Sequence, residues 1–235
     1  MIEVIPFRGL LYNLDITGPL DKLIAPPYDV ISSGQQQALY EKHPNNVVRL
    51  ILGKEFDSDT DADNRYTRSA QVFQDWINQE ILKKDDKPGF YIYSQQYEFG
   101  GEKFCRVGFF ARVKIEDFNE GNICPHEFTL SKAKTDRTKL LNACHANFSP
   151  IFGLYSDPDG EIDLYLNQET KSEPLSVIND GKVIHTFTGS GTFVTPGSFS
   201  ETVEFVNIGG GGSGGCSENG AGGGAGQILT GTTPI

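Results

Sequence analysis

The spacing of apolar residues predicts alternating strands and helices along the first part of the chain. Residues 4–12 are mostly apolar and predict a strand that Pro6 interrupts. Residues 46–52 (NVVRLIL) are apolar and β-branched, and they predict a buried strand. Residues 23–31 (LIAPPYDVI) predict a strand that enters and leaves a double proline. Two prolines stiffen such a loop because they fix φ and lack N–H donors, which suits a segment that holds one side chain in place.

Helices are predicted after these segments. Ser33 and Gln36 have the spacing of a capping box, which predicts a short helix. Asp63 is the expected cap of a helix over residues 64–82, and another helix is predicted over residues 130–144. The 64–82 helix has one apolar face at helical spacing, formed by Tyr66, Ala70, Phe73, Ile77 and Ile81.

A β-hairpin lies between these two helices in the predicted order. Residues 90–99 and 104–115 have strand composition, and Gly100 and Gly101 between them are a turn signal. A short strand over 149–157 (SPIFGLYSD) follows the last helix. Because the pattern contains an antiparallel pair and lacks a regular βαβ repeat, the fold class predicted is α+β.

The composition changes between residues 175 and 181, which predicts two parts, 1–175 and 182–235. The second part is rich in Thr, Ser, Gly and Val, and eleven of the eighteen residues 209–226 are glycine. Glycine has no side chain to bury and loses much backbone freedom on folding, so this tract cannot build an ordinary core. Its Val- and Phe-containing segments predict two or three strands in a short β and glycine-rich tail.

Charge and hydropathy exclude several classes of protein. The 235-residue chain has a net charge of −11, so its overall field repels DNA, RNA and anionic membranes. No apolar run reaches the ~20 residues that a membrane helix needs, and no signal-peptide pattern is present. The four cysteines show no CxxC spacing, which argues against a zinc or redox motif. We therefore expect a soluble cytoplasmic protein whose anion sites are local. The oligomeric state is left open.

Basic residues gather at one place in this acidic chain. Lys132, Lys134, Arg137 and Lys139 lie within eight positions of the predicted 130–144 helix. On a helical wheel Arg137 shares a stripe with Leu130, Leu141 and Cys144, so we expect it on or beside the apolar face. A partly buried arginine needs an anionic partner. That partner is either a ligand phosphate, which the helix N-terminus would also favour, or an internal carboxylate such as Glu127 or Asp136.

Two carboxylates and a histidine are candidates for chemistry near this helix. His126 and Glu127 precede it directly; His126 could donate to a phosphate oxygen, and Glu127 could ligate Mg²⁺ or act as a base. Asp29, held by the double proline, could be a general base or a metal ligand, or it could simply cap a turn. Arg8 lies in a strand-like run and needs an acidic partner or a ligand. Arg65, at the start of the 64–82 helix, is either a second anion contact or solvated.

The same residues carry a resemblance to a known family. The blocks that carry it, over about residues 2–157, are IPFRGLLYN, IAPPYDVIS, HPNNVVRLILGKE, NRYTRSAQVFQDW and GFFARVKIEDFNEGNICPHEFTLSKAKTDRTKLLNACHANFSPIFGLYSD. They resemble the domain of unknown function 1015 family. That family looks related to the ParB-like and sulfiredoxin-like superfamily, which includes nucleotide-dependent serine kinases. The resemblance therefore implies a ParB-like mixed core.

The resemblance also implies roles for individual residues. The block containing His126, Glu127, Thr129, Asp136 and Arg137 corresponds to the phosphate-binding segment. Asp29 would be the base for a substrate hydroxyl, and the cofactors implied are Mg²⁺ and a nucleotide, ATP or ADP. Genes of the family tend to neighbour serine-biosynthesis genes, which implies a small-molecule kinase acting on serine or a similar metabolite.

The chain departs from the family pattern at its end, where family members continue. Residues from 182 on instead resemble a glycine-rich domain of phage tail-type proteins, so we expect a chimeric join and an incomplete kinase domain. Three functions follow as hypotheses: a nucleotide-dependent small-molecule kinase, a nucleotide-binding regulator without turnover, and a phage structural fusion.

Overall fold

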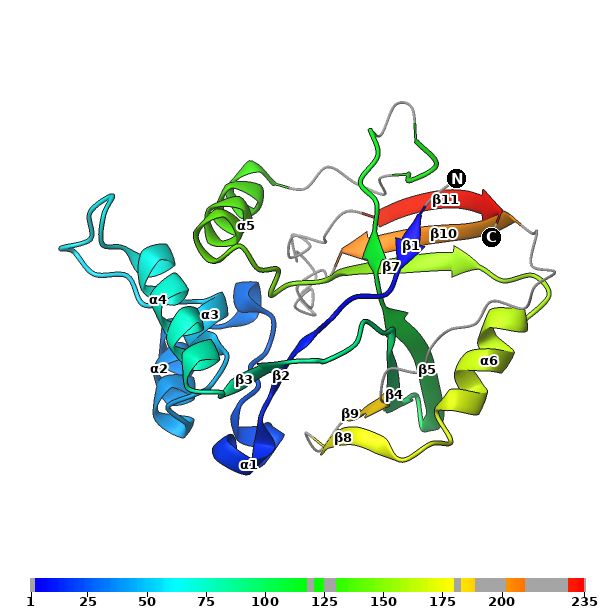
Figure 1. Ribbon diagram of the computed structural model, residues 1–235, viewed down its shortest axis with the longest axis horizontal. Helices are drawn as coiled ribbons and strands as arrows, with labels where there is room; N and C mark the ends of the chain where they lie inside the picture. The colour runs from blue at the N-terminus through cyan, green and yellow to red at the C-terminus, as the bar shows by residue number, and fades with distance from the viewer. Residues whose placement is uncertain are drawn as a thin grey trace.

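Helices α2 to α5 gather on one side of the molecule and the longer strands on the other (Figure 1). The computed structural model describes residues 3–117, 121–124, 130–179, 183–188, 202–209 and 228–234. Its α-helices are α1 (Leu14–Thr17), α2 (Ser33–Lys42), α3 (Val48–Ile51), α4 (Arg65–Asn78), α5 (Ser131–Cys144) and α6 (Glu161–Glu169), and its 3₁₀ helices are η1 (Leu20–Lys22) and η2 (Tyr28–Val30). Its strands are β1 (Val4–Ile5), β2 (Leu10–Tyr12), β3 (Leu82–Lys84), β4 (Tyr91–Phe99), β5 (Glu102–Phe110), β6 (Arg112–Val113), β7 (Ile151–Ser156), β8 (Pro174–Asn179), β9 (Val183–Thr188), β10 (Thr202–Gly209) and β11 (Ile228–Pro234).

The helical side has its own hydrophobic core, built from α3, α4, α5 and β3. Its buried members are Leu50, Phe73, Trp76, Ile81, Leu82, Leu140 and Cys144. The predicted apolar face of α4 is confirmed, because Tyr66, Ala70 and Ile77 pack against the same cluster. The predicted ends of this helix are wrong: Asn64 caps it, with the side chain accepting from the Tyr66 and Thr67 N–H groups, and the helix stops at Asn78.

Two predicted strands are absent from the described fold. Residues 48–51 form the helical turn α3, and residues 28–30 form η2 within an otherwise irregular 23–31 segment. The buried amide of Asn46 explains the first difference. Its Nδ2 donates to the Lys22 and Ile24 carbonyls at 2.8 and 2.9 Å, and its Oδ1 accepts from the Val48 N–H at 3.0 Å. These bonds start a helical turn where the apolar run alone predicts a strand.

The predicted hairpin is confirmed and forms part of the main sheet. β4 and β5 pair antiparallel over nine residues each, and Gly100 and Gly101 form the turn with φ of +62° and +82°. The sheet order is β5-β4-β9-β8. Helix α6 covers it, burying Ile162 and Leu166 against Ile92 in a second core. Helix α2 is also confirmed, with its capping box one residue earlier than predicted, at Ser32 and Gln35.

Shorter pairings complete the described fold. β1 pairs with β6, β2 with β3, and β10 with both β7 and β11, and every described pairing is antiparallel. The α+β class is therefore confirmed, whereas the ParB-like core stays a prediction. β9 lies beyond the composition change at 175–181 yet pairs with β4 and β8. The domain boundary stays a prediction.

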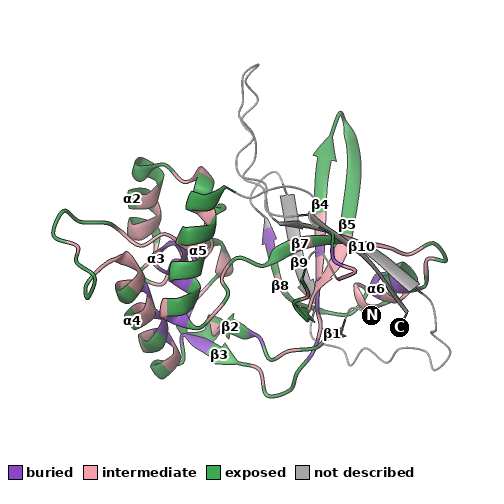
Figure 2. Ribbon diagram, turned by 90° about the horizontal axis from the view of Figure 1, so that it is seen from above, coloured by how far each residue is buried: buried purple, intermediate pink, exposed green. Residues whose placement is uncertain are grey.

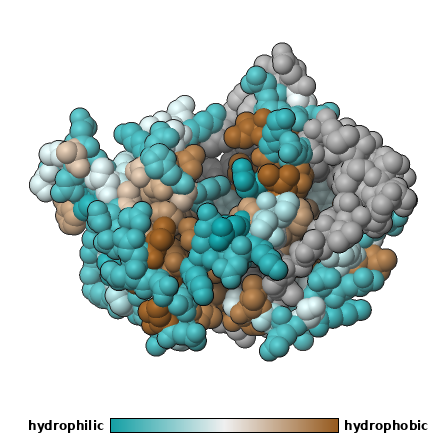
Figure 3. Space-filling model, viewed as in Figure 1, coloured by the Kyte–Doolittle hydropathy of each residue, from teal (hydrophilic) through white to brown (hydrophobic). Residues whose placement is uncertain are grey.

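Hydrophobic and hydrophilic residues are interspersed on the face of the molecule that Figure 3 shows. No helix in the described ranges is both long and apolar enough to cross a lipid bilayer.

Candidate functional site

Helix α5 and the short helix η2 meet through an arginine and a tyrosine. The guanidinium carbon of Arg137 lies 3.6 Å from the ring centroid of Tyr28. Asp29, the next residue, is exposed. Two of the segments that the sequence singles out, one around the double proline and one around Arg137 in α5, are thus brought together.

Asp136 is the centre of the polar contacts at this place. Its Oδ1 accepts from Tyr66 Oη at 2.8 Å and from Arg65 Nη2, and its Oδ2 accepts from Arg137 Nε at 2.8 Å and from Arg137 Nη2. The Asp136 side chain is 12% exposed. Burial acts to raise the pKa of this carboxyl, but the hydrogen bonds from Arg137 and Tyr66 and the charges of both arginines lower the pKa overall.

Arg137 is held on three sides. It donates to Asp136, its Nη2 also donates to the Ile51 carbonyl at 3.0 Å, and its ring contact is with Tyr28. The internal-carboxylate alternative is therefore the arrangement observed, with Asp136 as the partner. One donor is left: Arg137 Nη1 is buried and finds no acceptor in the part of the chain that the structure describes.

The helical wheel places Arg137 correctly beside the buried face of α5 but misplaces two leucines. Leu140 and Cys144 are buried, whereas Leu130 and Leu141 are 66% and 48% exposed. Leu130 is the N-cap residue of α5 and has no side chain that could accept from the first-turn N–H groups. The start of α5 therefore lacks a side-chain cap.

Arg65 was left open as an anion contact or a solvated residue, and the structure gives it two carboxylate partners. Its Nη2 binds Asp136, and its Nη1 lies 3.1 Å from Oε1 of the exposed Glu55. Tyr28 is a member of this cluster that the sequence did not single out. The signal available was an aromatic residue directly after a double proline, which also fixes the position of its ring.

The electrostatics of Tyr28 connect the two segments. Burial raises the pKa of the Tyr28 hydroxyl, Arg137 lowers it, and Asp29 and Asp136 raise it further. Asp29 thus lies within electrostatic reach of the same ring that supports the guanidinium. His126, Glu127 and Thr129, which complete the predicted site, lie outside the described residues.

Arg8 lies apart from this cluster. Its Nε donates to the backbone carbonyl of Asp85, and the Asp85 carboxylate accepts from Tyr91 Oη. Tyr91 Oη in turn accepts from the Gly9 N–H at 2.6 Å. The partner of Arg8 is therefore a neutral backbone carbonyl, and the described ranges show no ion pair between Arg8 and a carboxylate.

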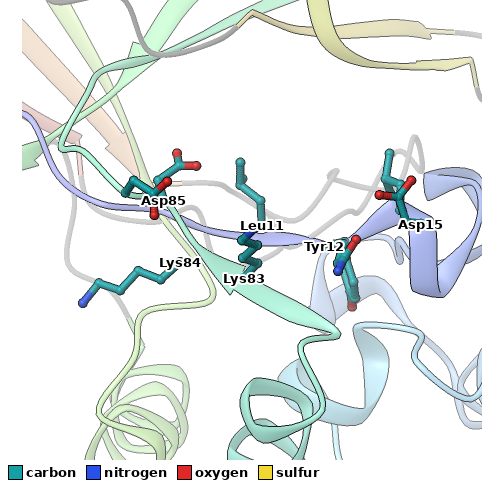
Figure 4. Close-up of a pocket in the computed structure, with 9 residues that line it drawn as sticks. Leu11, Tyr12, Asp15, Lys83, Lys84 and Asp85 are labelled. Atoms are coloured by element: carbon teal, nitrogen blue, oxygen red, sulfur yellow. The ribbon is translucent and has the colours of Figure 1, made fainter.

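A hollow of about 340 Å³ lies on the β2–β3 pair (Figure 4). Asp85 and Asp15 stand at its opposite ends, with Leu11 between them and Lys83 and Lys84 along β3. Asp29, Asp136 and Arg137 do not line it, so this hollow does not join the predicted site residues in one pocket. Within the described ranges, no group of three His, Cys, Asp or Glu side chains could hold a metal ion.

Comparison with known families gives a match over most of the chain. The model of a family described as "Protein of unknown function (DUF1015)" matches residues 4–189. The chain belongs to this family. The DUF1015 match covers every element from β1 to β9, including η2, α4 and α5, which hold the Asp136 cluster. Searches of curated proteins and of solved structures found no match.

Proposed function

We propose that this DUF1015 protein is a nucleotide-dependent kinase of a small hydroxyl-bearing metabolite, with free serine as the first candidate. The observation that carries the proposal is the guanidinium of Arg137, which lies over the ring of Tyr28, the residue before the exposed Asp29, and whose buried Nη1 has no acceptor among the described residues. A buried donor without an acceptor costs about 1–3 kcal/mol, so a phosphate oxygen at Nη1 would be favourable.

The start of α5 supports the same chemistry. Leu130 at its N-cap has no side-chain acceptor for the first-turn N–H groups, and a helix N-terminus favours phosphate through such donors and the helix dipole. The residues between the two segments would complete the site: His126 and Thr129 on phosphate, and Glu127 on the Mg²⁺ that accompanies the nucleotide.

In the reaction proposed, the substrate hydroxyl oxygen bonds to the terminal phosphorus of ATP or ADP, and the bond from this phosphorus to the bridging oxygen breaks, with ADP or AMP as the leaving group. Asp29 accepts the hydroxyl proton, and Arg137 stabilises charge on the transferred group. Phosphoryl transfer depends mainly on positioning and electrostatics, which is the kind of contribution that a fixed guanidinium provides. The ParB-like relationship of the core belongs to this proposal.

The test is to incubate the full chain with ATP or ADP, Mg²⁺ and L-serine, and to follow phosphoserine by mass spectrometry. We expect Asp29→Asn to lower turnover by about 10²–10⁴-fold while nucleotide binding is retained. We expect Arg137→Ala to weaken nucleotide binding, and Lys171→Ala, which removes an exposed cation just after α6, to leave it unchanged.

Three results separate the possibilities. Nucleotide binding without product favours a regulatory nucleotide-binding protein and rejects the kinase. A folded protein with no nucleotide affinity rejects both. If Arg137→Ala folds and binds nucleotide as the wild type does, the site is not at Arg137. The phage tail-type character of residues 182–235 stays a separate prediction.

A further inference from the structure

Strand β5 forms one edge of the main sheet. It pairs with β4 on one side, and the sheet order β5-β4-β9-β8 leaves its other side without a strand neighbour in the described part of the chain. Residues 102–106 of β5 are all exposed. Figure 2 shows the β4–β5 hairpin projecting from the body of the molecule with an exposed tip. An edge strand of this kind presents free N–H and C=O groups that pair readily with another strand.

One face of this hairpin is unusually aromatic for an exposed surface. Tyr97 is opposite Phe104 in the register, and their rings stack at 5.6 Å between centroids. Phe99, two residues further, is 75% exposed, and Phe104 is 40% exposed. Residues two apart on a strand share a face, so these three aromatic side chains stand together with those of Glu102 and Arg106.

Symmetry limits how two β5 edges can pair. A two-fold axis perpendicular to the sheet makes two identical edge strands run antiparallel. The same face of each copy then lies on the same side of the joined sheet. One residue therefore opposes its own copy. A centre at Lys103 would place two lysines opposite each other, which is unfavourable. A centre at Cys105 would place Phe104 opposite Arg106 and Glu102 opposite Gly108, so Glu102 would have no opposite charge across from it.

A centre at Phe104 gives a complementary register. Phe104 then opposes Phe104 of the second copy, so the two Tyr97–Phe104 stacks join into one aromatic row. Glu102 opposes Arg106 of the second copy, and the reciprocal pair forms by symmetry. Both charges are available, because neither Glu102 nor Arg106 belongs to an ion pair in the described ranges: Arg106 donates to the neutral Gln95 and lies 4.5 Å from the Phe152 ring centroid.

We propose that two copies of this protein associate by antiparallel pairing of their β5 edges, centred on Phe104 and aligned by two Glu102–Arg106 ion pairs. The opposite charges offset locally the repulsion between two chains that each carry a net charge of −11. Because one strand edge buries little area, the dimer is weak, with a dissociation constant on the order of micromolar. Added salt screens the ion pairs and weakens it further.

Charge reversal on the full chain tests the register by sedimentation equilibrium. Glu102→Arg places arginine opposite arginine, and Arg106→Glu places glutamate opposite glutamate, so each variant is expected to raise the dissociation constant about tenfold. An equimolar mixture of the two variants restores both ion pairs and is expected to form a mixed dimer. The controls are Asp57→Arg and Lys134→Glu, which reverse exposed charges elsewhere and are expected to dimerise as the wild type does.

A cross-link gives a second, independent readout. In the proposed register position 103 faces Cys105 of the second copy, so Lys103→Cys is expected to give a 103–105 disulfide-linked dimer on mild oxidation. Wild-type protein linked through two Cys105 residues would overturn the register. A wild type that stays monomeric up to about 100 micromolar, or single reversals that dimerise unchanged, would overturn the proposal.

Discussion

Replacing Asp136 by asparagine tests the structural role of the cluster around Arg137. An asparagine has the same shape but only one acceptor oxygen, so it can keep the bonds from Tyr66 and Arg65 or those from Arg137. If the oxygen stays toward Tyr66 and Arg65, the amide NH₂ faces Nε and Nη2 of Arg137, and donors oppose donors.

The decrease in the free energy of unfolding follows from the hydrogen bonds that Asp136→Asn removes. Hydrogen bonds to charged groups contribute about 1.5–3 kcal/mol each, and two such bonds to Arg137 disappear. The Asp136 and Arg137 side chains are 12% and 22% exposed, so water replaces part of what is lost. Arg137 also keeps its contacts with Ile51 and Tyr28. We therefore expect Asp136→Asn to lower the free energy of unfolding at pH 7 by about 2–4 kcal/mol.

The loss should depend on pH in a defined direction. The pKa of Asp136 in the folded protein is lowered below its ordinary value of 3.8. Its stabilising contribution is therefore complete above that value and is lost as pH falls through the lowered folded-state pKa. The asparagine variant does not titrate at this position. The difference in unfolding free energy between wild type and variant should thus shrink when pH falls below about 3.8.

Urea unfolding followed by circular dichroism at pH 7 and at about pH 3 measures both quantities. Asp57→Asn, at an exposed loop position, is the control and should change stability by less than about 0.5 kcal/mol. An Asp136→Asn protein as stable as the wild type at pH 7 would show that the carboxylate does not hold the two arginines. A difference that is equal at both pH values would refute the electrostatic explanation.

Other predictions concern single positions and are measured by the same unfolding assay. Asn46→Ala should lower the free energy of unfolding by about 2–4 kcal/mol, because it removes the three hydrogen bonds of a fully buried amide, two to the Lys22 and Ile24 carbonyls and one from the Val48 N–H; a loss under ~0.5 kcal/mol would contradict the assigned role of this amide. Gly9→Ala should lower the free energy of unfolding by about 1–3 kcal/mol, because the new Cβ would lie 2.7 Å from Cζ and Oη of Tyr91. Adding Tyr91→Phe in a double variant should recover part of that loss. Leu166→Ala should lower the free energy of unfolding by about 2–4 kcal/mol. Leu164 lies on the same helix but is 62% exposed, so Leu164→Ala should change this free energy little. Equal losses would contradict the second core.

Strong local signals predicted helices α2, α4 and α5 and the hairpin, whereas α1, α3 and α6 were not predicted. Helix α4 has a long apolar stripe, and the β4–β5 hairpin has two glycines whose positive φ values the turn requires. The caps were misplaced by one residue, because neighbouring residues were both suitable. Asp63 could have capped α4, but its carboxylate accepts from Arg68 at 2.7 Å, and Asn64 caps the helix instead.

The apolar run over residues 46–52 was misread because its structure is decided by distant contacts. A short buried run is compatible with a strand or a helical turn, and periodicity alone cannot distinguish them. The deciding bonds join Asn46 to the carbonyls of Lys22 and Ile24, more than twenty positions earlier. Gln36 shows the same effect at α2: its Nε2 donates to the Leu52 carbonyl, and the capping box forms with Gln35 instead.

The candidate site was partly predictable for a related reason. The helical wheel indicated that Arg137 lies beside the buried face of α5, and burial then requires an acceptor. Which carboxylate it meets, and that the same carboxylate also binds Arg65 from α4, depends on the packing of two helices. The stack on Tyr28 joins residues more than a hundred positions apart, beyond the reach of any local pattern.

If Arg137 binds a phosphate, as we propose, the same side chain serves the fold and the ligand through different donors. Nε and Nη2 are used by Asp136 and the Ile51 carbonyl, which fix the plane of the guanidinium against the Tyr28 ring. Only Nη1 is left for a phosphate oxygen. Since Arg137 can then offer a phosphate one donor rather than a two-bonded fork, the remaining contacts must come from the uncapped start of α5 and the residues before it. A guanidinium already fixed by a carboxylate loses little conformational freedom when a ligand binds. The ion pair with Asp136 would therefore assist the proposed ligand site and not compete with it.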